Sequence, residues 1–141
     1  MANDSSDFAR SMAIATSGLR AQAGRMRVIS ENIANADSTA PTAAGNPYRR
    51  KVPTFSSALD RTLDARVVTL GKVRTDQSEF RIKHEPSNPA ADAAGNVKYP
   101  NVNPLVEMTD MREAQRSYEA NLNIISATRR MIQRTLDILK A

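Results

Sequence analysis

The chain has 141 residues, a formal net charge of +5 and no cysteine. Its length corresponds to one domain at most, and the lack of cysteine excludes disulfides, thiolate metal sites and thiol nucleophiles. His84 is the single histidine, so there is no partner for a histidine metal site or a catalytic triad. No apolar run reaches the roughly 20 residues that cross a bilayer. We therefore expect no enzymatic activity, no cofactor and no insertion into a membrane.

The N-terminal segment carries an apolar stripe with heptad spacing. Its positions follow one another at alternating steps of four and three, which keeps them on one side of a helix and is typical of coiled coils. The sequence predicts a helix over 1–36, which ends near Asn35. Asn32 beside the stripe is expected either to help end the helix or to hydrogen-bond across to another helix. The stripe consists of Phe8, Met12, Ala15, Leu19, Gln22, Met26, Ile29 and Ile33.

The C-terminal segment repeats this spacing and predicts a second helix over 104–141. Asn103 can cap it, and Pro104 suits the first helical position because its missing N–H has no partner there anyway. Glu107, Asp110 and Glu113 follow at helical spacing; we interpret them as favourable charges at the positive end of the helix dipole, rather than as a metal or acid–base site. The stripe consists of Met111, Gln115, Tyr118, Leu122, Ile125, Arg129, Ile132, Leu136 and Leu139.

The middle segment, 37–103, contains six of the seven prolines, which excludes a long helix. Short strands are predicted at 67–70, 79–83 and 97–99 from their β-branched and aromatic residues and alternating polarity. A short amphipathic helical turn is predicted at 58–65. The expected fold is therefore mainly α: an antiparallel coiled coil of the two terminal helices (1–36 and 104–141) around a small β-containing or partly disordered middle segment.

Further apolar residues flank the two stripes, and a two-helix hairpin would leave them exposed. Because a lone hairpin buries little apolar surface, we expect the helices to pack against neighbouring copies. A self-contained helical bundle with a loose insertion is the alternative. The flanking residues are Ile14, Val28, Ala34, Ile124, Met131 and Ile138. The expected assembly interface comprises Leu19, Met26, Ile29, Asn32, Ile33, Met111, Tyr118, Leu122, Ile125, Ile132, Leu136 and Leu139.

A basic run, Arg49, Arg50 and Lys51, opens a stretch in which basic residues outnumber acidic ones. We expect a solvated loop or an electrostatic contact with an acidic neighbouring subunit. The alternative is a basic helical binding module that uses residues 47–83 on an acidic partner such as nucleic acid. Few aromatic residues accompany the charge and no nucleic-acid motif does, so nucleic acid is not the expected partner.

Several separated segments resemble the bacterial flagellar rod, hook and hook-associated proteins, and within them the proximal rod proteins of the C type. The first two segments carry the N-terminal signature of the superfamily, and the other four resemble the C type. Gln115 and Arg129 are polar positions within the C-terminal stripe. The matching segments are SGLRAQ at 17–22, ISENIANAD at 29–37, PYRRKV at 47–52, YPNVN at 99–103, EMTDM at 107–111 and RSYEAN at 116–121.

This resemblance implies a structural subunit of the flagellar basal-body rod, the periplasm-spanning drive shaft. It implies an antiparallel coiled coil of the terminal helices and contacts with other copies, other rod subunits, and basal-body adaptor and motor ring proteins. It also implies transit through the flagellar type III export apparatus without a cleaved signal peptide.

Overall fold

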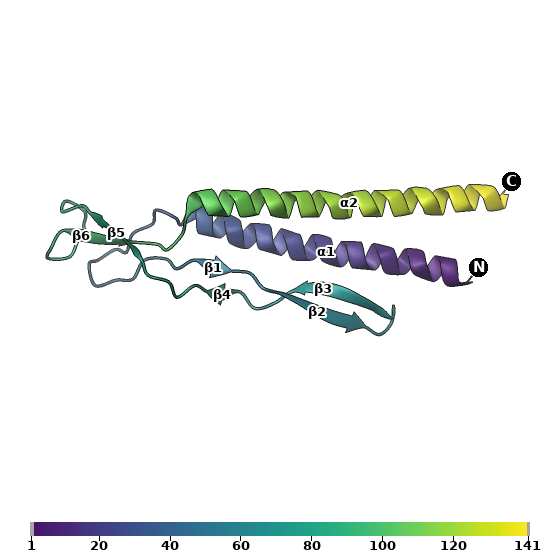
Figure 1. The fold of residues 1–141 in the computed structure, drawn as a ribbon, viewed down its shortest axis with the longest axis horizontal. Helices are drawn as coiled ribbons and strands as arrows, with labels where there is room; N and C mark the ends of the chain where they lie inside the picture. The colour runs from purple at the N-terminus through teal and green to yellow at the C-terminus, as the bar shows by residue number, and fades with distance from the viewer. Residues whose placement is uncertain (1, 141) are drawn as a thin grey trace. The chain divides into compact units, whose positions relative to one another are not determined.

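The computed structural model describes residues 2–140 of the chain, with side chains from Asp7 onward. Two long helices enclose the strands in sequence: α1 spans Ala2–Ala34 and α2 spans Pro104–Lys140 (Figure 1). The two predicted terminal helices are confirmed, although α1 ends at Ala34, two residues before the predicted end, and positions 1 and 141 lie outside the described residues. Within residues 2–140, no helix combines the length and the apolar character needed to cross a membrane.

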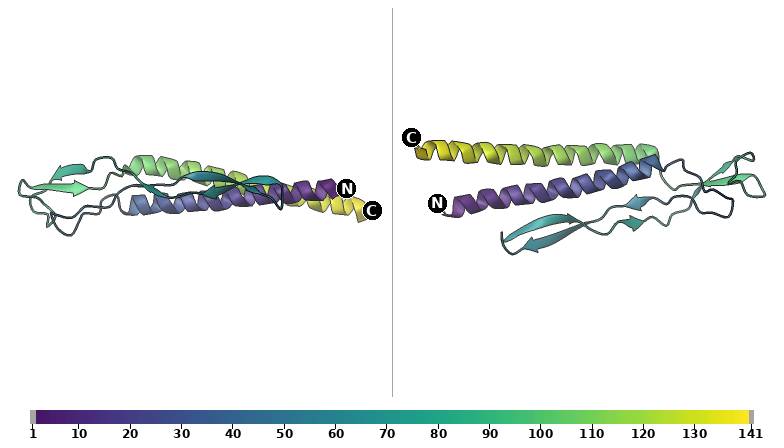
Figure 2. Two further views of the ribbon diagram at one scale, coloured as in Figure 1. Left: turned by 90° about the horizontal axis from the view of Figure 1, so that it is seen from below. Right: turned by 180° about the vertical axis from the view of Figure 1, so that it is seen from behind.

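Three antiparallel strand pairs form the middle segment: β1 with β4, β2 with β3, and β5 with β6 (Figures 1 and 2). The predicted strands at 67–70, 79–83 and 97–99 correspond to β3, β5 and β6. The middle segment is therefore β-containing, as expected. The strands are β1 Lys51–Val52, β2 Phe55–Asp60, β3 Ala65–Leu70, β4 Arg74–Thr75, β5 Arg81–His84 and β6 Asn96–Tyr99.

The helical turn predicted at 58–65 is wrong. Ala58 pairs with Val67 in the β2–β3 ladder, and Asp60 pairs with Ala65. Asp60 then accepts hydrogen bonds from the backbone N–H groups of Thr62 and Leu63, and Asp64 adopts a positive φ of 47°. The pairing of two β-favouring segments and this tight turn thus override a weak local helical pattern.

The chain forms two compact units, which are described separately. Unit 1 contains α1 up to Met26, the segment Thr54–Lys72 with the β2–β3 hairpin, and α2 from Glu113 onward. Unit 2 contains Arg27–Pro53 and Val73–Arg112, and so includes β1, β4, β5, β6, the end of α1 and the beginning of α2.

In unit 1 the β2–β3 hairpin packs on α1. The Arg10 Nε donates to the Leu63 carbonyl at 2.7 Å, and the Val68 N–H donates to Ser17 Oγ at 3.2 Å. The two approach closely at Gly24, where a Cβ would lie 2.7 Å from the end of the Leu70 side chain and that side chain would have to shift.

The buried stripe of α2 is displaced by one residue from the predicted one. Ala114 and Thr128 are buried, whereas the predicted positions Gln115, Leu122 and Arg129 are exposed. The predicted residues Met111, Tyr118, Ile125 and Ile132 are half-buried. Size explains the displacement: Asn121 lies against Gly18 of α1, where a Cβ would come within 2.8 Å of Asn121 Nδ2. Small side chains face α1 here, and hydropathy alone does not reveal them.

On α1, Ala15 and Ile29 of the predicted stripe are buried, and Leu19, Met26 and Ile33 are half-buried. Val28, which the hairpin was expected to leave exposed, is buried instead. The other flanking residues, Ile14, Ala34, Ile124, Met131 and Ile138, are exposed as expected.

Unit 2 has a small apolar cluster, in which Ala90 packs with Val97 and Tyr99 of β6. The Tyr99 hydroxyl donates to Glu85 at 2.8 Å. This hydrogen bond lowers the pKa of Glu85 and raises the pKa of Tyr99. Gly95 turns the chain between β5 and β6 with a φ of +80°, a conformation that side chains disfavour.

The cap predicted for α2 is confirmed: the Leu105 N–H donates to Asn103 Oδ1 at 3.1 Å, and the Glu107 N–H donates to the Asn103 carbonyl. We expect Asn103→Ala to lower the free energy of unfolding by about 1 kcal/mol, because the Leu105 N–H loses its side-chain acceptor, Asn103 Oδ1. Urea unfolding followed by circular dichroism measures this change. Asn123→Ala, within α2 and exposed, is the matched control and should be neutral or stabilising. An equal loss in both variants would contradict the capping role.

Candidate functional site

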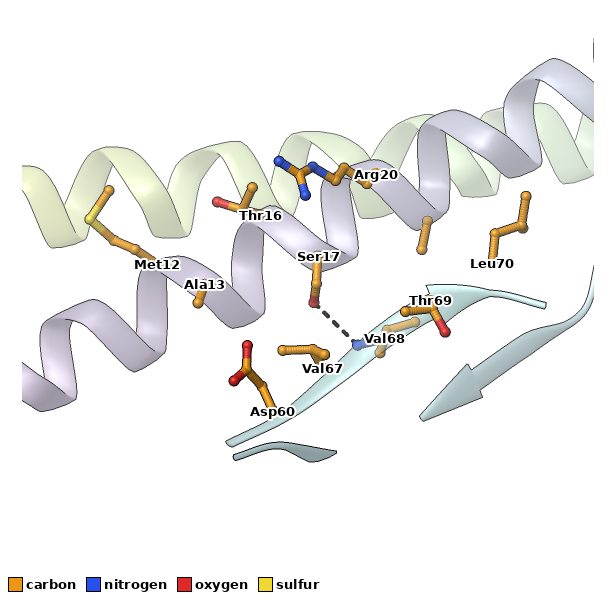
Figure 3. Close-up of a pocket in the computed structure, with 11 residues that line it drawn as sticks. Met12, Ala13, Thr16, Ser17, Arg20, Asp60, Val67, Val68, Thr69 and Leu70 are labelled. Atoms are coloured by element: carbon orange, nitrogen blue, oxygen red, sulfur yellow. Dashed lines mark hydrogen bonds between the residues drawn. The ribbon is translucent and has the colours of Figure 1, made fainter. Parts of the chain in front are cut away.

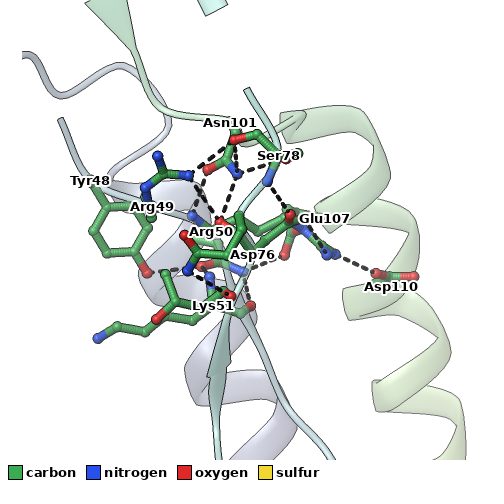
Figure 4. A network of polar contacts seen from close by, with 12 residues as sticks. Tyr48, Arg49, Arg50, Lys51, Asp76, Ser78, Asn101, Glu107 and Asp110 are labelled. Carbon is green, nitrogen blue, oxygen red and sulfur yellow. Dashed lines mark hydrogen bonds and ion pairs between the residues drawn. The ribbon is translucent and has the colours of Figure 1, made fainter. Parts of the chain in front are cut away.

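Unit 2 contains a cluster of polar side chains, which we call the Asn32 cluster (Figure 4). It joins the end of α1, the segment leading into β1, the residues after β4 and the beginning of α2. Two of its members, Asn32 and Glu107, are almost completely removed from solvent, at 0% and 1% exposure. The cluster comprises Asn32, Tyr48, Arg50, Lys51, Asp76, Asn101, Glu107 and Asp110.

Asn32 uses its full hydrogen-bonding capacity. Its Oδ1 accepts from the Tyr48 hydroxyl at 2.8 Å and from the Lys51 N–H at 2.9 Å. Its Nδ2 donates to the Lys51 carbonyl at 2.8 Å and to Glu107 at 3.0 Å. The side-chain amide thus pairs with the backbone of Lys51 as a neighbouring strand would. The bond to Glu107 reaches from α1 to α2, as one of the two sequence interpretations expected.

Glu107 is a buried carboxylate and needs a compensating charge. Arg50 supplies it, with its Nε 2.6 Å from Glu107 Oε1. The same guanidinium lies 3.7 Å from Asp110 and 3.9 Å from Asp76. Glu107 was interpreted from sequence as a helix-dipole charge; its position in the first turn of α2 fits that role, but its main partners are Arg50 and Asn32.

Backbone contacts hold Arg50 in place. Its N–H donates to Asn101 Oδ1 at 2.8 Å, and its carbonyl accepts from the Asp76 N–H at 2.8 Å. The Asn101 Nδ2 in turn donates to Ser78 Oγ at 2.8 Å. Hydrogen bonds from Ser78 lower the pKa of Asp76. These bonds fix the backbone of Arg50. They thereby limit the directions from which its guanidinium can reach the Glu107 carboxylate, which makes the ion pair specific.

The predicted basic run is thus engaged inside unit 2. Arg49 donates to the Ser78 carbonyl at 3.0 Å and lies 4.1 Å from the centre of the Phe80 ring. Arg50 pairs with Glu107, and Lys51 forms an ion pair with Glu31. An electrostatic contact of these three residues with a neighbouring subunit stays a prediction.

The cluster has no arrangement suited to metal binding. Among the residues that the structure describes, no group of three His, Asp or Glu side chains could hold a metal ion. Arg50, Asn101 and Asp76 were not connected by the sequence analysis, because they are distant in the chain. The signal that was present is the polar Asn32 beside an apolar stripe, together with the PYRRKV and YPNVN segments.

Unit 1 contains a groove of about 530 Å³ between α1 and the β2–β3 hairpin (Figure 3). Met12, Thr16 and Arg20 of α1 line one side, and Val67–Leu70 of β3 line the other. The lining is largely apolar, with Arg20 and Asp60 as its charged residues. We call this feature the α1–β3 groove.

α2 carries large apolar side chains that the chain leaves exposed in unit 1. Ile124, Met131 and Ile138 recur every seven residues and therefore share one face of the helix. Leu136 and Leu139, which belong to the predicted stripe, are also exposed, and Leu139 remains 65% exposed. Large apolar side chains that stay exposed on one helix are candidates for an interaction surface.

Family models match both ends of the chain. The model described as flagella basal body rod protein matches residues 12–40, and the C-terminal model of the flagellar basal body rod FlgEFG proteins matches residues 93–138. The flagellar basal-body rod protein FlgC of Agrobacterium fabrum is 52% identical over 128 residues, which cover 91% of this chain and 92% of the relative. The chain belongs to the FlgC family of flagellar basal-body rod proteins.

Two more distant members of the FlgC family agree. The Bacillus subtilis protein is 37% identical and covers 92% of this chain and 97% of its own length. The Salmonella typhimurium protein is 39% identical, with 89% and 92% covered. Membership of this family of structural rod proteins confirms the resemblance identified from sequence and the expectation of a structural, non-enzymatic role.

We expect Arg50→Ala to lower the free energy of unfolding by about 3–5 kcal/mol, because Glu107 would remain buried without its cation. The double variant Arg50→Met with Glu107→Met should lose less, about 1–3 kcal/mol, because no buried charge remains and the main loss is the acceptor of Asn32 Nδ2. Arg49→Ala, the neighbouring control, should cost about 1 kcal/mol. Urea unfolding of the three variants measures these differences. Equal losses in the single and double Arg50 variants would contradict the charge-compensation argument.

Burial, followed by the negative charges of Glu31 and Glu107, raises the pKa of Tyr48 to about 12. An unfolded tyrosine has a pKa of about 10, so the folded state holds this proton more tightly. The resulting stabilisation is complete below pH 10 and is lost as the pH rises through 12. We expect the free energy of unfolding to fall more steeply between pH 10 and 12 in the native protein than in Tyr48→Phe. Tyr118→Phe is the control and should follow the native curve.

Proposed function

We propose that this chain is a structural subunit of the proximal rod and polymerises through its terminal helices to form part of the periplasm-spanning drive shaft. The observation that carries this proposal is the exposed apolar surface of α2, which a soluble monomer has no reason to maintain. It continues to the end of the described helix, where Ile138 is 77% exposed. In an assembled rod, neighbouring helices would cover these side chains and supply burial that one chain lacks.

The two helices form an antiparallel coiled coil in this proposal. Contacts within each unit support it. In unit 1, Arg25 of α1 lies 3.5 Å from Glu113 of α2, and Gly18 lies against Asn121. In unit 2, Asn32 contacts Glu107. Residue numbers rise on α1 as they fall on α2, which is the pattern of antiparallel helices.

Other rod subunits are the first partners, because the family consists of rod proteins. Basal-body adaptor and motor ring proteins would meet the subunit at the base of the rod. The flagellar type III apparatus would export the chain with no signal peptide removed. These finer partners follow from the family resemblance.

The alternative function, a basic module that binds nucleic acid through residues 47–83, loses support from the Asn32 cluster. Arg49, Arg50 and Lys51 have protein partners for their charges. A nucleic-acid backbone would have to displace carboxylates that already neutralise two of them. The geometry therefore favours assembly over nucleic-acid binding.

The test uses Leu139→Asp in a strain that lacks the native gene. This side chain is exposed in the single chain, so the charge leaves the fold intact but opposes burial against a neighbour. We expect motility to be lost and the subunit content of purified basal bodies to fall at least about tenfold. Glu119→Asp, also exposed on α2, is the control and should assemble normally. Normal motility of the Leu139→Asp strain would refute polymerisation through this end of α2.

A further inference from the structure

The two predicted stripes each contain a glutamine, and these glutamines have different surroundings. Gln115 on α2 is exposed, whereas Gln22 on α1 is half-buried. The side-chain oxygen of Gln22, Oε1, is removed from solvent, and among the residues that the structure describes none donates a hydrogen bond to it. Leaving a buried amide oxygen without a donor costs more free energy than a typical hydrogen bond contributes. The polar end of Gln22 therefore restricts what can pack against it.

Gln22 lies on the side of α1 that faces α2 in unit 1. One turn before it, Gly18 lies against Asn121, since a Cβ at Gly18 would come within 2.8 Å of Asn121 Nδ2. One turn after it, the Arg25 guanidinium lies 3.5 Å from the Glu113 carboxylate. Residues three or four apart share one face of a helix. Gln22 therefore lies between two positions of α1 that contact α2.

These contacts identify the residue of α2 that lies opposite Gln22. Residue numbers fall on α2 as they rise on α1 in both contacts. The step of four residues from Gly18 to Gln22 thus corresponds to a step of four residues back from Asn121, which leads to Ser117. Ser117 is half-buried, and its carbonyl accepts a hydrogen bond from Asn121 Nδ2 at 2.9 Å. The part of α2 opposite Gln22 is therefore polar.

α2 has two faces that could pack on α1, and the structure uses the smaller and more polar one. Ala114, on the same face as Asn121, is 0% exposed, whereas Leu122 on the neighbouring face is 42% exposed. Successive residues are about 100° apart around a helix, so a rotation of α2 by about that angle would exchange the two faces. A large apolar side chain would then lie opposite Gln22 and could not donate a hydrogen bond to it.

We propose that Gln22 selects the face of α2 that packs on α1, through a hydrogen bond that its side-chain oxygen accepts from the Ser117 hydroxyl. A serine hydroxyl rotates to suit its acceptor, so it can turn toward this oxygen. The need for a donor opposes the rotation that would bury Leu122, as polar residues within apolar stripes fix the pairing of other helices. This inference rests on the proposed function, because the selected rotation leaves the large apolar side chains of α2 exposed for neighbouring copies.

Cysteine labelling tests this selection, because the native chain contains no cysteine. The reporters are Ala114→Cys on the buried face and Leu122→Cys on the exposed face, each labelled with a maleimide in the full-length chain. Gln22→Leu should let α2 rotate toward its apolar face. We expect the labelling rate of Ala114→Cys to rise at least about fivefold and that of Leu122→Cys to fall at least about threefold. Circular dichroism verifies the fold of each variant.

Two variants of Ser117 separate the hydrogen bond from packing. Ser117→Ala removes the proposed donor and should shift both labelling rates in the same directions as Gln22→Leu. Ser117→Thr keeps a hydroxyl and should leave both rates within about twofold of the native values. Gln115→Leu makes the same substitution at an exposed glutamine of α2 and is the control, which should change neither rate.

Unchanged labelling rates in Gln22→Leu or in Ser117→Ala would overturn the inference. A rise of both rates would overturn it as well, because it would show that the helices separate instead of rotating. Labelling is measured on the unassembled chain and does not depend on the rod. If the inference fails, loss of motility in Leu139→Asp would still support polymerisation through α2. Normal motility of that strain would remove the proposed function and leave the labelling result intact.

Discussion

A carboxylate that is buried must have its charge compensated, and unit 2 is built around meeting this constraint at Glu107. Arg50 provides the cation, and Asn32 provides a neutral donor. Because each of these groups lies on a different segment, satisfying Glu107 fixes the end of α1, the approach to β1 and the beginning of α2 against one another. Removing any one group would leave a buried polar atom without its partner, which costs far more than the net value of a single hydrogen bond.

Polar side chains also explain how so few large apolar residues suffice in unit 2. Ala90, Val97 and Tyr99 form one small apolar cluster, and the other buried apolar side chains of unit 2 include Val28, Ile29 and Val102. The Asn32 side chain pairs with both backbone groups of Lys51, as a neighbouring strand would. Asn101 similarly bridges two segments, because it accepts from the Arg50 N–H and donates to Ser78 Oγ. Such a network specifies one arrangement of loops that have little regular secondary structure of their own.

Unit 1 follows a different principle. Gly18 and Gly24 let α2 and the hairpin approach α1 closely, and small residues of α2 face α1. Large apolar residues are therefore released from the internal contact and remain on the surface as Ile124, Met131 and Ile138. Because small residues of α2 face α1, the helices pack closely and the large residues of α2 stay exposed. They fit a subunit whose apolar surface is completed by neighbouring copies.

The sequence by itself determined the two helices, the cap at Asn103, three of the six described strands and the family, because these depend on local periodicity, on local capping residues and on short segments that resemble the family's. It also indicated Asn32 as a residue that could reach another helix. Only the tertiary structure decided which face of α2 is buried against α1. The face with Ala114 is buried and the one with Leu122 is exposed, because the helices approach closely at Gly18 and small side chains fit there better. The same holds for the strand at Ala58 and for the pairing of Arg50 with Glu107. Arg50 and Glu107 are far apart in the chain, and their contact compensates a buried charge. A local sequence pattern does not encode a contact over that separation.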